Sequence, residues 1–414
     1  MGNMSKYIIR AAPDYLPISA HEFVKHFSNL LTQESFKHWI EYESYTKIFG
    51  YACRSLFETS MEYFSRNKDI VVATTPLHHT SFHEIIEKYV KPENIHIIGL
   101  NDTFNGIGDL PDIDKCDVVV ITHLFGLDMD LSKLAKFKEK HNCLILEDRV
   151  QGGTLDIDFS HELVDIAYYS MAMDKRPIAL GGGFIHVRNN HKKIIKDLIE
   201  IIDNYPIEKT SRRFKDLLKK IPTFLLYNNR SFLFSFISLI KLLNIFNRNI
   251  NILKIGKSYR KTNPGFVRKG YLVKPSPGLL KSMYQNYEKH KHAELKYTTN
   301  YQFFINSMPE KIVKIFFPWY KGIPSITPYN TILLKENLVD PFLIFLCDHN
   351  IPGLPNPTYK LFNHSYTNDE KYKKFNNGIA YLPSTTNMKK ADIIQITNLI
   401  KEFYVKHQST IEKR

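Results

Sequence analysis

The chain has 414 residues, a length that can bury a large core without help from disulfides or a metal ion. Its apolar share of 43% is ordinary for a globular protein and excludes a wholly disordered chain. Although the formal net charge is +14, the Lys and Arg residues are spread along the chain without an RRM, zinc-finger or arginine-rich signature, so we predict no nucleic-acid partner.

Between residues 70 and 190, short apolar runs alternate with polar, helix-like stretches such as His83–Tyr89 and Leu131–His141. The runs are rich in Ile and Val and do not alternate strictly, which is typical of strands buried on both faces of a sheet. Repetition of strand, helix and strand predicts a mainly parallel α/β sheet. The predicted strands are Ile70–Thr74, Ile95–Leu100, Val118–Thr122, Cys143–Leu146, Ile166–Ser170 and Phe184–Val187.

The region from about 191 to 270 has a different pattern. Lys192–Asp203 is a basic helical stretch, and Ser231–Phe246 is apolar almost all the way round but short for a membrane span. We favour a helix buried against the body of the protein or against a second subunit. The alternative is a peripheral membrane contact through residues 223–250, because Lys and Arg residues flank the apolar run.

From about residue 271 the chain resembles a smaller α+β unit. Thr331–Leu334 and Ala380–Leu382 are predicted strands, and Ala391–Tyr404 is a closing amphipathic helix. The predicted organisation is an N-terminal part with a large α/β domain over residues 1–190, a helical, partly apolar insert or linker over 191–270, and a small domain over 271–414.

The cysteines form no CxxC pair, which argues against a zinc ribbon and a disulfide framework and favours a reducing compartment. The N-terminal residues contain no long apolar stretch of the kind found in secretory signals. We therefore expect a cytoplasmic protein.

Three segments carry residues suited to chemistry: HLFG at 123–126, LILEDRVQGG at 144–153 and YYSMAMDK at 168–175. Asp148 and Lys175 both fall just after predicted strands, at the edge where α/β folds place ligands. Pyridoxal phosphate needs a lysine amine for an imine, a carboxylate for its pyridine nitrogen and donors for its phosphate. Each residue alone has a simpler interpretation, since an Asp can cap a helix and a Lys is commonly a surface residue.

Together, these segments resemble the DegT-type sugar aminotransferases, which are fold-type-I pyridoxal-phosphate enzymes. The family pattern is approximately H-x-x-G, then E-D-A-A-Q-x-x-G, then S-F-x-x-x-K and a Gly-Gly turn. The likeness covers roughly residues 50–190 and, more weakly, 270–405. It implies a large domain with a mainly parallel sheet and a smaller α+β C-terminal domain. The matching residues, in the same order, are His123, Gly126, Glu147, Asp148, Gln151, Ser170, Lys175, Gly182 and Gly183.

The resemblance also implies roles for individual residues. Lys175 would hold the cofactor through the imine and then act as the acid and base of the proton shift. Asp148 would pair with the pyridine nitrogen, and Gln151 would lie near the phenolic oxygen. Val150 would lie under the ring, and Ser170 would donate to the phosphate.

Two more segments supply cofactor-binding candidates by resemblance. Arg54 and Ser55 match a turn where backbone amides at a helix start bind phosphate, which is physically reasonable. Either His78 or His79 would supply the aromatic ring that stacks on the cofactor. A metal site is the alternative there, because His79 and His83 are four residues apart. Since no third histidine lies at a motif spacing, we predict no metal.

The predicted reaction is transfer of an amino group, from glutamate to a keto sugar nucleotide used in surface-polysaccharide or glycan biosynthesis, by a homodimer. The chain departs from the family in two places: Arg149 and Val150 replace a pair of alanines, and 274–277 has no clear N-x-R counterpart. These departures leave two alternatives: an enzyme of this fold with a non-sugar substrate, or a catalytically silent relative that binds a partner or membrane.

Overall fold

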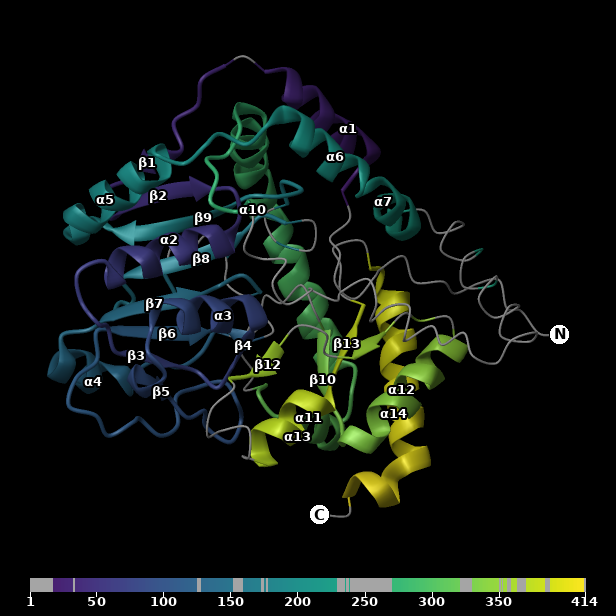
Figure 1. Ribbon diagram of the computed structural model, residues 1–414. Coiled ribbons are helices and arrows are strands. Elements are labelled where there is room, and N and C mark those ends of the chain that lie inside the picture. Colours follow the sequence, from purple (N-terminus) through teal and green to yellow (C-terminus); the bar gives the residue numbers. More distant parts are fainter. Residues whose placement is uncertain are drawn as a thin grey trace.

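The protein is described here by a computed structural model. It describes residues 18–32, 34–124, 128–151, 159–172, 175, 178–228, 235, 238, 270–320, 330–349, 351, 353–355, 359–362, 370–383 and 388–412. Within these residues the largest sheet has eight strands in the order β1-β2-β9-β8-β7-β6-β3-β5 (Figure 1). The strands are β1 (Trp39–Glu41), β2 (Tyr45–Gly50), β3 (Val72–Thr74), β5 (Ile95–Ile97), β6 (Val118–Thr122), β7 (Leu144–Asp148), β8 (Ile166–Ser170) and β9 (Gly183–Arg188).

The predicted mainly parallel sheet is confirmed. Strands β5, β3, β6, β7 and β8 pair in parallel, whereas β9 is antiparallel to both β8 and β2. The predicted bounds of β6 and β8 are correct to the residue, because every residue of these apolar runs is buried. Strand β7 extends two residues beyond its predicted end, so that Asp148 is the last residue of the strand rather than the first after it.

Helices cover both faces of this sheet. Helices α2 (Cys53–Ser65), α3 (Thr80–Tyr89) and α5 (Lys192–Asp203) share one apolar core with the strands. On the other face, α4 (Leu134–His141) and the 30-residue α10 (Pro277–Asn306) complete the burial. Burial on two faces explains the continuous apolar runs of β6 and β8.

Helix α10 links the sheet to the C-terminal part (Figure 1). Its first turns pack on β8 and β9, and its last turns join a core shared with the C-terminal strands and helices. Strands β10, β13 and β11 form an antiparallel sheet, as expected for an α+β unit. The C-terminal elements are α11 (Glu310–Phe316), β10 (Asn330–Leu333), α12 (Glu336–Asp348), β11 (Leu354–Pro355), β12 (Tyr359–Leu361), α13 (Glu370–Gly378), β13 (Ile379–Leu382) and α14 (Lys390–Glu412).

Three helices lie together beside the first turns of α10: α1 (Ala20–Ser28), α6 (Thr210–Leu218) and α7 (Ile221–Asn228) (Figure 1). The rings of Phe23 in α1 and Phe224 in α7 stack at 4.5 Å between centroids. The predicted apolar helix Ser231–Phe246 lies outside the described residues except for two positions. Among the helices that the structure describes, none combines the length and the hydropathy needed to cross a membrane.

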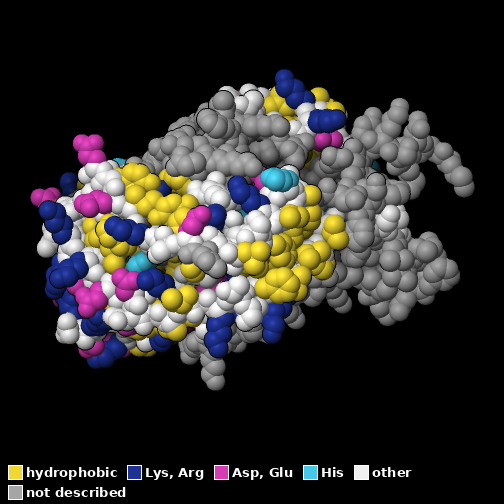
Figure 2. Space-filling model, turned by 90° about the horizontal axis from the view of Figure 1, so that it is seen from above, with side chains coloured by type: hydrophobic (Ala, Val, Ile, Leu, Met, Phe, Trp, Pro, Cys, Tyr) yellow, Lys and Arg dark blue, Asp and Glu magenta, His cyan; other side chains and the backbone are white. Residues whose placement is uncertain are grey.

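Surface charges of both signs are interspersed on the described part of the face shown in Figure 2, where Lys and Arg lie among Asp and Glu. Ion pairs also occur on the described surface, for example between Arg66 and Glu62 at 3.2 Å. Exposed pairs of this kind contribute only about 0–1 kcal/mol each. The Lys and Arg side chains that give the chain its net positive charge do not form a single stripe on the described part of the face in Figure 2.

Candidate active site

A cavity of about 340 Å³ opens at the carboxyl edge of the parallel strands. Its volume suits a small-molecule ligand. The structure brings seven of the nine predicted site residues to its wall, whereas Ser55 and His78 are not among the lining residues. The seven are Arg54, His79, Asp148, Val150, Gln151, Ser170 and Lys175.

Asp148 reaches the cavity because β7 ends there, paired with β6 through Thr122 and with β8 through Tyr168. Its carboxylate accepts two hydrogen bonds of 2.8 Å, from the Val150 N–H to Oδ1 and from His78 Nε2 to Oδ2. His78 is fully buried. His78 thus holds the Asp148 carboxylate and does not line the cavity. Of the two histidines suggested for stacking on the cofactor, His78 is therefore the less suitable.

His79 is the histidine on the cavity wall. It precedes α3, and its Nδ1 accepts a hydrogen bond of 3.2 Å from the Ser81 N–H. Burial, followed by the positive charges of Arg54 and Lys175, lowers the pKa of His79 to about 3. Its ring is therefore uncharged at neutral pH and presents a flat aromatic surface.

The first residues of α2, Ala52 to Arg54, form another part of the wall. The Ser55 hydroxyl donates to the Ala52 carbonyl at 2.7 Å and accepts from its N–H at 3.1 Å. Ser55 therefore closes the first turn of the helix with its side chain, and its predicted part in a phosphate-binding turn, which concerns backbone amides, stays a prediction. The start of α2 suits an anion, because the first N–H groups of a helix lack partners within the helix and the residues that carry them line the cavity.

The Gly-Gly turn lies directly under this helix start. A Cβ at Gly183 would come within 2.5 Å of the Cys53 backbone nitrogen and 2.7 Å of the Tyr169 carbonyl oxygen. Gly182 has φ of +86°, a conformation that side chains with a Cβ rarely adopt. Glycine at both positions lets β9 approach α2 closely enough to shape the cavity.

The connection from β8 to β9 carries Ser170 and Lys175. The Ser170 Oγ accepts a hydrogen bond of 3.4 Å from the Ala172 N–H, so its own hydrogen can point elsewhere. The Lys175 N–H donates to the Ala172 carbonyl at 3.1 Å, which closes a turn. This turn presents the Lys175 side chain to the cavity.

Several wall residues were not predicted from the sequence. Arg213, Asp216 and Lys220 come from α6 and the residues before α7, and Tyr51 and Tyr271 complete the same side. No motif marks them, but their spacing of three and four residues places the first three on one helix face. This spacing is the one feature of the sequence that could have linked the three residues. It does not identify them as site residues until α6 is known to lie beside the cavity.

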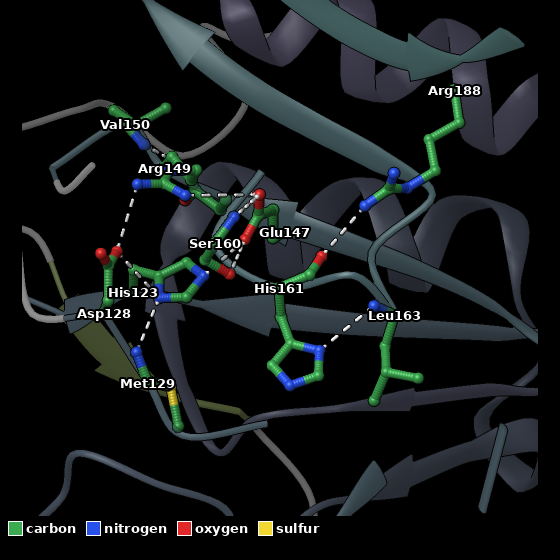
Figure 3. Close-up of polar contacts among 11 residues, drawn as sticks. His123, Asp128, Met129, Glu147, Arg149, Val150, Ser160, His161, Leu163 and Arg188 are labelled. Atoms are coloured by element: carbon green, nitrogen blue, oxygen red, sulfur yellow. Dashed lines mark hydrogen bonds and ion pairs between the residues drawn. The ribbon is translucent and has the colours of Figure 1, made fainter. Parts of the chain in front are cut away.

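A buried polar network surrounds Glu147, the residue before Asp148 in the chain (Figure 3). His123 Nε2 donates to Glu147 Oε2 at 2.9 Å, and the Ser160 N–H donates to Glu147 Oε1 at 3.0 Å. Arg149 Nη2 lies 3.2 Å from Asp128 Oδ1, and its Nη1 lies 3.7 Å from Glu147 Oε1. Burial alone would raise the pKa of Glu147, but Arg149, His123 and Ser160 hold it below its ordinary value.

The network gives a physical reason for one departure from the DegT pattern. Arg149 occupies a position where that pattern has a small residue, and its side chain is buried beside the buried Glu147. It joins the segments after β6 and β7 through its two carboxylate contacts. No group of three or more His, Cys, Asp and Glu side chains fit to hold a metal ion lies in the described part of the chain.

No family model matches the chain, and no curated protein matches its sequence. Solved structures do match it along almost its whole length. PseC from Helicobacter pylori, an aminotransferase involved in the biosynthesis of pseudoaminic acid, superposes with a TM-score of 0.63 and 12% identity over 96% of this chain and 99% of that one. An aminotransferase from Psychrobacter cryohalolentis superposes with a TM-score of 0.65 and 11% identity over 95% and 98%.

A third match is NtdA from Bacillus subtilis with the bound cofactor PMP, with a TM-score of 0.61 and 10% identity over 97% of this chain and 86% of that one. At such identities the likeness establishes the fold. The chain therefore has the fold-type-I architecture predicted from its sequence.

Proposed function

We propose that this protein is a pyridoxal-phosphate-dependent aminotransferase of the DegT type, with Lys175 as the residue that attaches the cofactor. The observation that carries the proposal is the convergence of Lys175, Asp148, Ser170 and the start of α2 on one cavity. When bound, the cofactor supplies a ring that accepts electrons from the substrate carbon. The aminotransferase PseC and the PMP complex of NtdA, both similar in fold, add support.

The residues present fit such a cofactor. The Lys175 amine is a nucleophile for an aldehyde and afterwards carries a proton. Asp148, held by two hydrogen bonds, presents a carboxylate to a protonated ring nitrogen. The uncharged ring of His79 can stack on the cofactor, and the Ser170 hydroxyl can donate to its phosphate.

The remaining predicted contacts concern the phosphate and the ring. The start of α2 and the Arg54 side chain place positive potential where a phosphate would bind. Val150 lies on the wall beside Asp148, as expected for a residue under the ring. Gln151 follows it, within reach of the same space, and would contact the phenolic oxygen.

For the substrate, we propose a keto sugar nucleotide as amino acceptor and glutamate as donor. Four cationic and two anionic side chains line the cavity, an excess that suits anionic substrates. The DegT resemblance supports the sugar and the homodimer. The four cysteines are free thiols, which supports a cytoplasmic location.

The test of cofactor attachment is direct. Purified protein saturated with pyridoxal phosphate should show visible absorbance, and borohydride reduction should fix the cofactor on the peptide that contains Lys175. A Lys136→Ala variant is the matched control, because Lys136 is an exposed lysine outside the cavity and its loss should leave labelling unchanged. Colourless protein, or label on another lysine, would contradict the proposal.

His78 is expected to act as a positioning residue for Asp148. Removing its hydrogen bond in a His78→Phe variant should lower kcat by about 10- to 100-fold, since hydrogen bonds to charged groups contribute about 1.5–3 kcal/mol. KM should change little, because His78 does not line the cavity. The control is His83→Phe, which removes a buried histidine of α3 whose ring lies 6.0 Å from that of His78 and whose Nε2 makes no hydrogen bond to any residue that the structure describes. Equal losses in the two variants would assign His78 a merely structural role.

A further inference from the structure

Helix α6 forms a wall of the cavity from outside the α/β sheet. Arg213 of this helix is 3% exposed, and its two Nη atoms donate to the carbonyl oxygens of Leu180 and Ala179, each at 3.0 Å. Both carbonyls belong to the connection between β8 and β9 that also carries Lys175. A bidentate bond from a buried guanidinium fixes geometry well. Helix α6 is therefore anchored to the loop that presents Lys175.

The same helix face extends to Lys220, seven residues after Arg213. Its Nζ donates one hydrogen bond of 3.2 Å to the Asp216 carbonyl oxygen, which leaves two N–H donors. The Asp216 carboxylate accepts a hydrogen bond of 3.3 Å from the Tyr51 hydroxyl. Among the described residues, no carboxylate lies within 4.0 Å of the Lys220 ammonium group. This cation on the wall thus has two further donors, and the carboxylates of Asp216 and Glu208 act on it only from beyond ion-pair distance.

We propose that Lys220 binds an anionic oxygen group of the substrate, either the carboxylate of the amino donor or the phosphate of the acceptor, and so determines which substrates the cavity accepts. This inference rests on the proposed function. It assigns substrate recognition to Lys220, just after α6, whereas the predicted cofactor contacts lie at the sheet edge, at the start of α2 and at the end of β4.

The electrostatics of this wall favour an anion. Burial, followed by the positive charge of Arg213, lowers the pKa of Lys220 to about 8. The ammonium is therefore costly to keep charged without a ligand, and an approaching anion would offset that cost. Arg54 lies over the Tyr271 ring at 4.6 Å and adds positive charge to the same cavity.

The test compares Lys220→Met with Lys219→Met in the cofactor-loaded protein. Lys219 is the matched control, because it carries the same charge one residue earlier but is exposed and outside the cavity lining. The affinity for L-glutamate is taken from the concentration dependence of its single-turnover rate, and that for uridine diphosphate is measured by calorimetry. Lys220→Met should weaken at least one of them by about 10- to 100-fold, the range for a hydrogen bond to a charged group. Lys220→Arg should retain more binding than Lys220→Met, because the positive charge remains although the shape of the donor group changes.

The ligand whose affinity falls identifies the source of the anionic group. Unchanged affinity of Lys220→Met for both ligands, or no binding of either by the wild-type protein, would overturn the inference. Thermal unfolding of each variant shows that the fold is intact, and Lys220→Gln replaces the methionine variant if that one unfolds. Failure of the proposed function would be seen in a different measurement, because the wild-type protein loaded with cofactor would then show no visible absorbance.

Discussion

Replacement of Lys175 by alanine should reduce the rate of amino transfer by about 10²- to 10⁴-fold through lost proton transfer alone, with a further loss from the missing covalent attachment. Asp148, Ser170 and the start of α2 would still hold the cofactor by non-covalent contacts, so the variant should bind it more weakly but not lose it. Single-turnover kinetics with glutamate measures the step in which Lys175 moves the proton.

Two controls make this expectation specific to the amine. Methylamine supplied in solution should restore part of the activity of Lys175→Ala, because it can enter a cavity of about 340 Å³ and carry the proton. It should not rescue Asp148→Ala, which lacks a carboxylate rather than an amine. Thermal unfolding checks that the variant is folded, and the hydrogen bond from the backbone N–H of residue 175 to the Ala172 carbonyl is kept when the side chain is shortened. Turnover at more than about a tenth of the wild-type rate would remove Lys175 from the chemistry.

The parts of the fold that follow from the sequence are those where burial leaves a simple pattern. Strand β6 is an unbroken apolar run buried on both faces, and its bounds were predicted correctly. Strands β1 and β2 were missed, because Lys47 interrupts the apolar pattern of β2. That lysine is fully buried and lies 3.3 Å from the centroid of the Tyr287 ring. A charge stabilised by an aromatic ring from α10 is visible only after the distant segments have come together.

In the candidate site, too, some residues could be predicted from the sequence and others could not. Asp148 and Lys175 were predicted because strand ends meet at one edge of a parallel sheet. The sequence alone could not distinguish His78 from His79, since this depends on which face of β4 (Leu77–His79) each side chain occupies. Pairing of β4 with β12 settles that β4 is a strand, with His78 opposite Lys360 and His79 opposite Tyr359. The residues of α6 line the cavity because of a tertiary contact, and no local sequence pattern predicts that contact.

Replacement of Arg149 by methionine should lower the free energy of unfolding by about 3–5 kcal/mol, the cost of removing one partner of a buried ion pair. The side chains of Glu147 and Arg149 are both fully buried, so the Glu147 carboxylate would lose its nearest cation without gaining water. Urea unfolding measures the change. The control is Arg66→Met, which breaks the Arg66–Glu62 pair of 3.2 Å on the surface and should cost less than about 1 kcal/mol.

The loss of stability in Arg149→Met should depend on pH, and the direction of that dependence can be predicted. In the wild type the pKa of Glu147 is lowered on folding, so its stabilising contribution is present above the unfolded pKa and is lost as pH falls through the folded pKa. Without Arg149, the folded pKa of Glu147 should rise, because only His123 and Ser160 then oppose the effect of burial, and the ionised carboxylate should contribute less stability above that pKa. The difference in the free energy of unfolding between the variant and the wild type should therefore become smaller at acidic pH. Adding Glu147→Gln to Arg149→Met should recover most of the loss at neutral pH, because no buried charge is then left unpaired. A loss that is independent of pH and unaffected by the second substitution would show that Arg149 acts by filling space rather than by its charge.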